Sequence, residues 1–240
     1  MVETDKQIFR QTQLIIFLIG ISEDRLDYVN FEMEKVIDIL KKEAENNSDK
    51  DIKINLFNFS DGGKWLYKEP IDVEECIWRG IANSRHISFV SAFANLNDKL
   101  SRNHGFLSTQ THLVPLIILI GDDVPSDNYQ PQLHLLKHNR WFCNAAKFAI
   151  GDNYNQEIMV DFSGNEETVI SFRILKNSLP KMMFHPYWSD EIMEAPASEN
   201  PINLDDCDEC VNTGNEKTIE DKYDFDAIDS VDTQKFDDYW

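Results

Sequence analysis

The chain has 240 residues, which is enough for one α/β domain of ordinary size and an additional segment. Its formal net charge is −20, and a chain this acidic repels phosphate backbones, so we expect no binding to nucleic acids. No apolar run reaches the roughly 20 residues that a membrane-spanning helix needs. The N-terminal residues lack the pattern of a signal peptide, and the 4 cysteines are too few for a disulfide scaffold. We therefore expect a soluble, cytoplasmic protein.

The acidic residues are concentrated near the C-terminus. Residues 186–240 contain 17 Asp and Glu but only 3 Lys, a net charge of −14, whereas residues 1–185 carry a net charge of −6. The composition of the later segment leaves little apolar surface to bury. We therefore predict an α/β domain over residues 1–185 and a largely disordered acidic tail over residues 186–240. Aromatic residues among its aspartates leave two interpretations of the tail open, a solvated extension or a segment that docks on a partner.

Two nearly continuous apolar runs, residues 12–19 and 114–120, predict central strands that are buried on both faces. Residues 52–59 alternate between apolar and polar side chains, which predicts a strand nearer the edge of the sheet. A two-glycine turn at Gly62 and Gly63 predicts that residues 64–67 return as the hairpin partner of that strand.

Apolar residues at helical spacing predict further elements along the chain. The expected helices cover residues 24–44, 89–100, 130–146, 156–162 and 166–179, with a strand over residues 145–150 and connections over residues 70–75 and 82–88. Strands that alternate with helices are typical of βαβ units. The sequence therefore predicts an α/β fold with a doubly wound, mainly parallel sheet.

Polar side chains follow both central strands. Ser22 and Asp24 come after the first strand, and Asp122 and Asp123 come after the second. The carboxyl ends of parallel strands lie at one edge of a sheet, where open α/β sheets bind their ligands. Carboxylate and hydroxyl oxygens are ligands that Mg²⁺ prefers. Together with a hydroxyl from the loop over residues 82–88, these side chains predict a candidate metal site.

These segments resemble the von Willebrand factor A (VWA) domain, and within it the intracellular bacterial type associated with tellurium resistance. The family's first strand ends in Asp-x-Ser-x-Ser, where this chain has LIIFLIGISEDR. A later strand of the family ends in Thr-Asp-Gly-x-Pro-Thr-Asp, where this chain has ILIGDDVPSD. The resemblance covers residues 13–180 and implies a VWA-like fold.

The resemblance also implies a degenerate form of the family's metal-ion-dependent adhesion site, or MIDAS. Gly20 stands in place of the first aspartate, Ser22 is retained, and Asp24 replaces the second serine. Ser88 is the hydroxyl nearest to the family's loop threonine, and Asp122 is retained. The candidate ligands of Mg²⁺ or another divalent cation are therefore Ser22, Asp24, Ser88 and Asp122. The alternative is that Asp24 caps the first helix and Asp122 caps a turn.

As a function, the resemblance implies a non-enzymatic protein-interaction module in a bacterial stress-response or defence assembly. Intracellular relatives of this type are often found beside kinases and phosphatases, so the implied protein partner is a kinase or a phosphatase. One alternative is a Mg²⁺-dependent hydrolase or phosphotransfer enzyme that uses Asp122 and Asp123. Another is a scaffold whose metal site is inactive.

Two further motifs carry weaker signals. Cys207 and Cys210 form a single C-x-x-C without the additional ligands that a zinc site needs. His134 and His138 have the i, i+4 spacing of a zinc pair, but Leu135 stands where the metalloprotease motif has a glutamate. We therefore interpret the two histidines as surface or packing residues.

Overall fold

The computed structural model of the chain describes residues 11–46, 50–60, 63–81, 87–101, 104–107, 114–151 and 155–171. All of these residues belong to one compact unit, Met1–Asn200, and Pro201–Trp240 is a second unit. The predicted tail, its boundary at residue 185 and the pair Cys207 and Cys210 lie outside the described residues. The division at residue 185 therefore stays a prediction.

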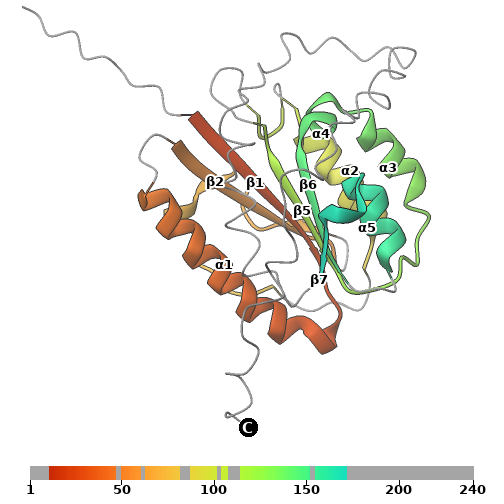
Figure 1. Cartoon of the computed structure of the whole chain (residues 1–240), viewed down its shortest axis with the longest axis horizontal. Helices are drawn as coiled ribbons and strands as arrows, with labels where there is room; N and C mark the ends of the chain where they lie inside the picture. Colours follow the sequence, from red (N-terminus) through yellow and green to blue (C-terminus); the bar gives the residue numbers. More distant parts are fainter. Residues whose placement is uncertain are drawn as a thin grey trace, which may run out of the picture. The chain divides into compact units, whose positions relative to one another are not determined.

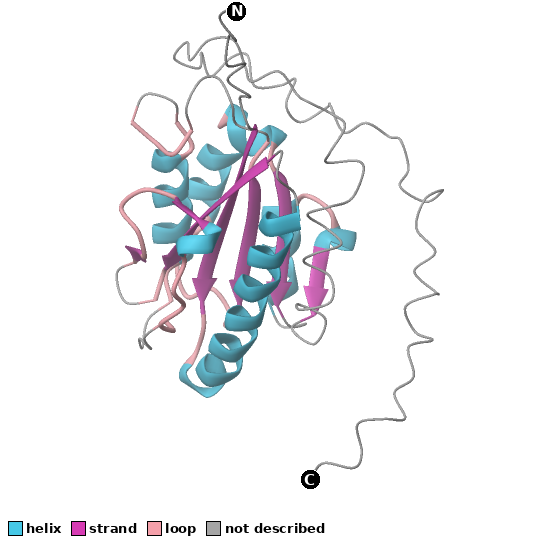
Figure 2. Cartoon of the chain, turned by 90° about the vertical axis from the view of Figure 1, so that its left-hand side faces the viewer, coloured by secondary structure: helices cyan, strands magenta, loops and turns pink. Residues whose placement is uncertain are grey.

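One mixed sheet forms the centre of the described structure. Its strands are β1 (Gln11–Gly20), β2 (Lys50–Asn58), β3 (Lys64–Trp65), β4 (Ile71–Asp72), β5 (Leu116–Gly121), β6 (Ala146–Gly151) and β7 (Val169–Ser171). The strand order is β3-β2-β1-β5-β6-β7, and β4 also pairs with β2. β1, β2, β5, β6 and β7 are parallel, so their carboxyl ends lie at one edge (Figure 2). β3 and β4 run antiparallel to β2, as the predicted hairpin requires for β3.

Helices cover both faces of the sheet. The helix α1 (Leu26–Asn46) lies on one side, while α2 (Phe89–Lys99), α3 (Gln130–Lys137) and α5 (Gln156–Ser163) lie on the other (Figure 1). β1 supplies both cores alternately: Leu14, Ile16 and Leu18 face α2, α3 and α5, and Ile15, Phe17 and Ile19 face α1. Because β1 is buried on both faces, its sequence is a nearly continuous apolar run. The structure thus confirms the predicted doubly wound, mainly parallel α/β fold.

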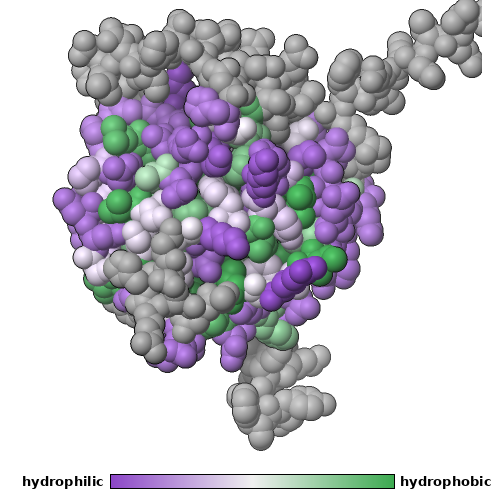
Figure 3. Space-filling view, turned by 180° about the vertical axis from the view of Figure 1, so that it is seen from behind, coloured by the Kyte–Doolittle hydropathy of each residue, from purple (hydrophilic) through white to green (hydrophobic). Residues whose placement is uncertain are grey.

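Hydrophilic side chains dominate the described surface in the view from behind, with hydrophobic ones dispersed among them (Figure 3). This is expected when two cores on either side of the sheet take up the large apolar residues. In the parts of the chain that the structure describes, no helix has both the length and the apolar character to cross a membrane.

The helix predicted over residues 130–146 is wrong in one respect, because it is two helices. α3 ends at Lys137, and α4 (Arg140–Asn144) begins after Asn139. The Asn139 side-chain oxygen accepts hydrogen bonds from the Trp141 and Phe142 amides at 2.9 and 3.4 Å, which caps α4. Its amide group donates to the Asn97 side chain at 2.9 Å and to the Leu100 carbonyl at 3.1 Å. Asn139 therefore starts a new helix and ties it to the end of α2.

The helix predicted over residues 166–179 is also wrong in its described part. Gly164 adopts a left-handed conformation with φ 82° and ends α5. A short 3₁₀ turn, η4 (Glu166–Thr168), then leads into β7, which pairs with β6 in parallel. Val169 and Ile170 are β-branched and suit a strand, and pairing with an open sheet edge outweighs the helical spacing. Residues 172–179 lie outside the described residues.

The connection predicted over residues 70–75 contains regular structure. It holds β4 and the 3₁₀ turn η2 (Val73–Glu75), whose Val73 is fully buried. β4 is only two residues long, and its pairing with β2 depends on a distant segment, so local periodicity does not reveal it.

We predict that Asn139→Ala lowers the free energy of unfolding by about 1–2 kcal/mol, because α4 loses its cap and its tie to α2. Chemical denaturation measures the change. Asn144→Ala is the matched control, because its side chain is exposed and donates to the Arg140 carbonyl within the same helix, and it is expected to shift stability by less than about 0.5 kcal/mol. Equal effects of the two substitutions would contradict the capping role.

Candidate functional site

The ends of β1 and β5 meet at the carboxyl edge of the sheet. Gly20 of β1 pairs with Gly121 of β5, so the residues that follow leave the sheet side by side. The chain turns from β1 to β2 in one direction and later reaches β5 on the other side of β1. This reversal of strand order is the position at which open α/β sheets form their crevice.

Ser22 and Asp122 are in direct contact at this edge, although 100 residues separate them in the sequence. The Ser22 amide donates to Oδ1 of Asp122 at 2.8 Å, and the Ser22 hydroxyl donates to Oδ2 at 2.5 Å. Asp122 is 5% exposed, so its carboxylate is shielded from water and depends on these donors. The structure thus brings together two of the four predicted site residues.

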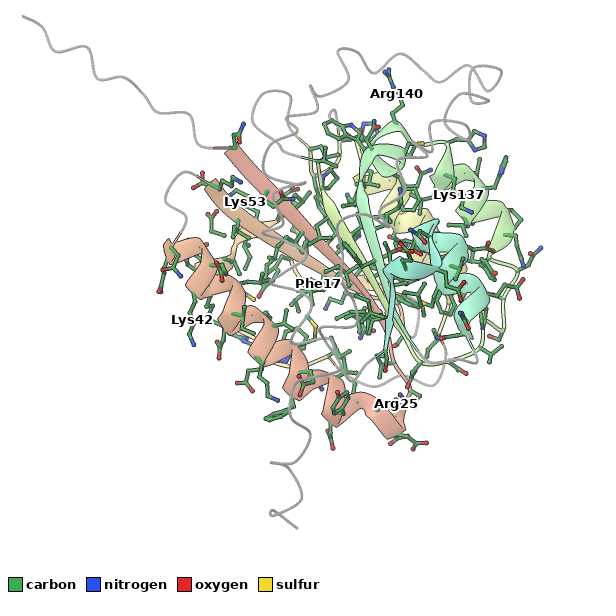
Figure 4. The ribbon with its side chains drawn as sticks, viewed as in Figure 1. Phe17, Arg25, Lys42, Lys53, Lys137 and Arg140 are labelled. Carbon is green, nitrogen blue, oxygen red and sulfur yellow. The ribbon has the colours of Figure 1, made fainter. Side chains whose placement is uncertain are left out.

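Arg25 lies beside the same carboxylate. Its Nε atom is 4.0 Å from Oδ2 of Asp122, and the Asp122 side chain is only 1% exposed. A 3₁₀ turn, η1 (Glu23–Arg25), fixes this position, since the Arg25 amide donates to the Ser22 carbonyl at 3.3 Å. Figure 4 shows Arg25 near the beginning of α1, at the opposite end of the sheet from Arg140. The buried carboxylate therefore has a cationic neighbour from its own chain.

Phe59 fills the space beside Gly20. A Cβ atom added at Gly20 would lie 2.1 Å from the Phe59 ring, which is closer than any side-chain contact allows. The Phe59 ring is fully buried and packs against Phe89 with ring centroids 5.1 Å apart. Its amide also donates to the Ile19 carbonyl at 3.0 Å. The position after Ile19 therefore accommodates glycine and no larger residue while this ring is in place.

Ser88 serves the start of α2 in the described structure. It is the N-cap of α2, and its hydroxyl accepts a hydrogen bond from the Ser91 amide at 3.1 Å. The same hydroxyl donates to Oδ2 of Asp127 at 2.9 Å, and the Val90 amide donates to that oxygen at 3.0 Å. Asp127 therefore fastens the loop after β5 to the N-terminus of α2, where a negative charge is favourable.

Asp24 and Asp123 point to solvent rather than into the contact between Ser22 and Asp122. Both residues are exposed, Asp24 within η1 and Asp123 in the loop after β5. Oδ1 of Asp123 accepts a hydrogen bond from the next amide, that of Val124, at 2.8 Å. Asp122 and Asp123 thus have different surroundings, one buried and one exposed, and do not form a paired-carboxylate arrangement.

The comparisons with known proteins concern the fold. No protein-family model matches the sequence, and no curated protein matches it. Among solved structures, proximal thread matrix protein 1 from the mussel byssus, in a form with a zinc-occupied MIDAS motif, is similar with a TM-score of 0.51 and 17% identity. The ArnB paralog VWA2 from Sulfolobus acidocaldarius is similar with a TM-score of 0.52 and 15% identity. The fold is that of a VWA domain.

The matched regions cover 71% of this chain and 47% of the mussel protein, and 70% of this chain and 44% of the archaeal protein. The chain therefore spans less than half the length of either protein. At these identities the similarity establishes the VWA fold alone. The tellurium-resistance type inferred from the sequence stays a prediction.

The donors at the VWA strand ends do not fit a divalent cation in the arrangement described. The described residues contain no group of three or more His, Cys, Asp or Glu side chains placed to hold a metal ion. Asp122 is the buried carboxylate, and it already accepts hydrogen bonds from Ser22 and has the positive charge of Arg25 beside it. Gly20 offers no carboxylate, and Asp24 is exposed. Mg²⁺ keeps several waters and takes few protein ligands, so the feature that disfavours it here is the guanidinium group of Arg25, 4.0 Å from the Asp122 carboxylate.

The sequence interpretation missed three residues of this site: Arg25, Phe59 and Asp127. Asp127 lies within the quoted segment ILIGDDVPSD, so its position in that motif was the available signal. Arg25 follows the predicted ligand Asp24 directly, but its contact with Asp122 depends on the pairing of two distant strands. Phe59 was assigned only to a strand, because nothing local indicates that its ring reaches Gly20.

The two histidines, His134 and His138, lie at the end of α3, away from the strand-end residues in the sequence. His134 is exposed, and Nδ1 of His138 is 2.7 Å from the His134 carbonyl oxygen. Their rings meet edge to face with centroids 4.2 Å apart. His134 is thus a surface residue and His138 a half-buried one that packs against it, in line with the interpretation of the pair as surface or packing residues.

We predict that Asp122→Ala lowers the free energy of unfolding by about 2–3 kcal/mol, because the Ser22 amide and hydroxyl lose a buried charged acceptor. Asp123→Ala is the matched control, since its side chain is exposed, and it should change stability by less than about 0.5 kcal/mol. Urea denaturation followed by tryptophan fluorescence distinguishes the two. A neutral effect of Asp122→Ala would rule out the described hydrogen bonds as stabilising contacts.

A second prediction concerns the space that Phe59 occupies. Gly20→Ala should destabilise the chain by about 1–3 kcal/mol, because the new methyl group overlaps the Phe59 ring. In a Phe59→Leu background the same substitution should cost clearly less, since the smaller side chain leaves room. A double-mutant cycle measures this coupling. Additive effects would show that the two positions do not interact.

Proposed function

We propose that this chain is a non-enzymatic protein-interaction module of the VWA type, and that it contacts its partner through the strand-end face. We define this face by Ser22–Asp27 after β1 and Asp122–Asp127 after β5. The observation that carries the proposal is the contact between Ser22 and Asp122, which joins two loops into one surface at the reversal of strand order. Binding residues are commonly found on loops that a rigid scaffold positions in this way.

The charge of the strand-end face indicates the chemistry of the partner. Glu23, Asp24, Asp27 and Asp123 are exposed on it, whereas its cationic residue, Arg25, is directed to Asp122. The face is therefore acidic towards solvent. A partner that presents lysine or arginine side chains is electrostatically complementary, and such complementarity speeds association and selects among partners.

An apolar side chain lies within the same face. Val124 is 55% exposed, next to the exposed Asp123 in the loop after β5. An apolar centre with charged residues around it is typical of protein interfaces. We therefore propose that Val124 is buried against the partner and that the neighbouring carboxylates contact its basic residues.

Several finer expectations from the sequence stay predictions. They are help from Mg²⁺ or another divalent cation, a kinase or phosphatase as the partner, a role in a bacterial stress-response or defence assembly, and a cytoplasmic location. The resemblance stated for the sequence supports the last three. The mussel protein with a zinc-occupied MIDAS motif supports the first as a property of the fold, while the donor set described above disfavours it for this chain.

We predict that a photo-crosslinking residue placed at Val124 captures a partner in cells, whereas the same residue at Leu135 does not. Leu135 is the matched control, because it has a similar exposure of 46% and lies on α3. The double charge reversal Asp24→Lys and Asp123→Lys should remove the Val124 adduct. With the purified partner, this variant should raise the dissociation constant by about tenfold or more at low salt. The increase should be smaller at high salt, because salt screens the charges.

Two outcomes would contradict the proposal. One is equal crosslinking at Val124 and Leu135, and the other is an adduct that the charge reversal leaves unchanged. The enzymatic alternative has its own test, which is the hydrolysis of p-nitrophenyl phosphate. If the chain catalysed this reaction with Mg²⁺, and Asp122→Asn abolished it without unfolding the chain, the enzymatic function would be the correct one.

A further inference from the structure

We propose that Arg25 takes the place of a divalent cation beside Asp122, so that the strand-end face works without a metal ion. The inference deepens the proposed function by giving the chemistry of the same face, and part of its reasoning is independent of any partner. Asp122 keeps a buried carboxylate, with 1% of its side chain exposed, although the described donors around it do not fit an ion.

A buried carboxylate needs compensation for the water it has lost. Oδ1 of Asp122 accepts a hydrogen bond from the Ser22 amide at 2.8 Å, and Oδ2 accepts one from the Ser22 hydroxyl at 2.5 Å. The Arg25 Nε atom lies 4.0 Å from Oδ2 and supplies the opposite charge. Both oxygens are therefore engaged by groups of the chain itself.

The same contacts exclude a divalent cation. An ion held by Asp122 and the Ser22 hydroxyl would have to break the hydrogen bond between them. It would also lie close to the guanidinium group of Arg25, whose side chain is 36% exposed, and two cations at so short a separation repel each other. In η1 the Arg25 amide donates a hydrogen bond to the Ser22 carbonyl, which fixes the backbone position from which the Arg25 side chain reaches Asp122.

Within the described residues, neither the end of β1 nor η1 supplies a second buried carboxylate beside Asp122. Gly20 has no side chain, and the Phe59 ring occupies the space into which one would extend. Asp24 is exposed in η1. Three residues from different segments therefore each disfavour a bound cation: Arg25, Gly20 and Phe59.

A direct consequence is that removing the charge of Arg25 should create a cation site. In Arg25→Gln the carboxylate of Asp122 loses its cationic neighbour and becomes available to an ion, whereas Arg25→Lys keeps the positive charge. Arg140→Gln is the matched control for the loss of an arginine, because Arg140 is exposed and lies at the opposite end of the sheet (Figure 4).

The experiment uses the full chain and Mn²⁺ as the probe, with binding followed by calorimetry at physiological salt. The tail carries many carboxylates, so the relevant quantity is the binding that Asp122→Asn removes. We expect no such component in the wild type, Arg25→Lys or Arg140→Gln. We expect one in Arg25→Gln, with affinity at least about tenfold above the background sites, and none in the double variant Arg25→Gln with Asp122→Asn.

A second measurement does not depend on any variant. Mn²⁺ broadens the NMR signals of nearby amides, and the Ser22 amide lies within 2.8 Å of the Asp122 carboxylate. In the wild-type chain its signal should stay sharp while Mn²⁺ broadens signals of the acidic tail. Selective broadening of Ser22, an Asp122-dependent component in the wild type, or no gain in folded Arg25→Gln would each overturn the inference.

These results are separable from those of the proposed function. If Mn²⁺ bound at Asp122 in the wild-type chain, the role proposed for Arg25 would be wrong. The strand-end face could then still bind a partner, with an ion in the contact. Loss of the specific adduct at Val124 would remove the contact surface but leave the chemistry of Arg25 unchanged.

Discussion

The parallel pairing of β1 with β5 is the constraint on which the strand-end face depends. The register that places Gly20 opposite Gly121 also places Ser22 within hydrogen-bond distance of Asp122. A shift of one residue would turn alternate side chains of β1 from one core to the other, which the buried residues on both faces do not allow. The geometry of the face is therefore specified by the two hydrophobic cores, although none of its polar residues contributes to them.

The two less exposed carboxylates of this region, those of Asp122 and Asp127, stabilise loops of the chain itself. Asp122 holds the turn after β1 through Ser22, and Asp127 holds the start of α2 through Ser88 and the Val90 amide. Buried charges are costly unless they are paired and hydrogen-bonded. Asp122 meets this condition through Ser22 and Arg25, whereas Asp127 is hydrogen-bonded at Oδ2 but its buried Oδ1 has no hydrogen-bond partner among the described residues. The exposed carboxylates have no such task, which leaves Asp24 and Asp123 available to a partner under the proposed function.

The sequence predicted those parts of the fold whose cause is local. The continuous apolar run of β1 and the spacing of Val29, Met33 and Val36 in α1 follow directly from burial on two faces and on one face. β7 was predicted as helix, because its strand character comes from pairing with β6 rather than from its own pattern. The break between α3 and α4 was missed, because Asn139 receives its role from α2.

The candidate site shows the same division. Ser22 and Asp122 were predicted to meet because parallel strands end at one edge, and they do meet. The expected roles of Asp24 and Ser88 as ligands had no comparable geometric basis, and the structure places one in solvent and the other at the N-terminus of α2. The roles of Arg25 and Phe59 could not be predicted from the sequence, because they depend on side-chain positions that are determined only in the folded chain.

The departures of this face from a metal-binding VWA domain are physically coupled. A carboxylate at position 20 cannot be accommodated while the Phe59 ring packs against Phe89, because its Cβ atom alone would overlap the ring. Replacing the ring by a smaller residue would open a cavity in the core that α2 covers, which costs stability. Even with space restored, Arg25 would still repel an ion at Asp122. Of these conditions, the charge of Arg25 is the one that a single substitution removes without opening the core, so under the inference for Arg25 this internal cation is what keeps an ion from Asp122.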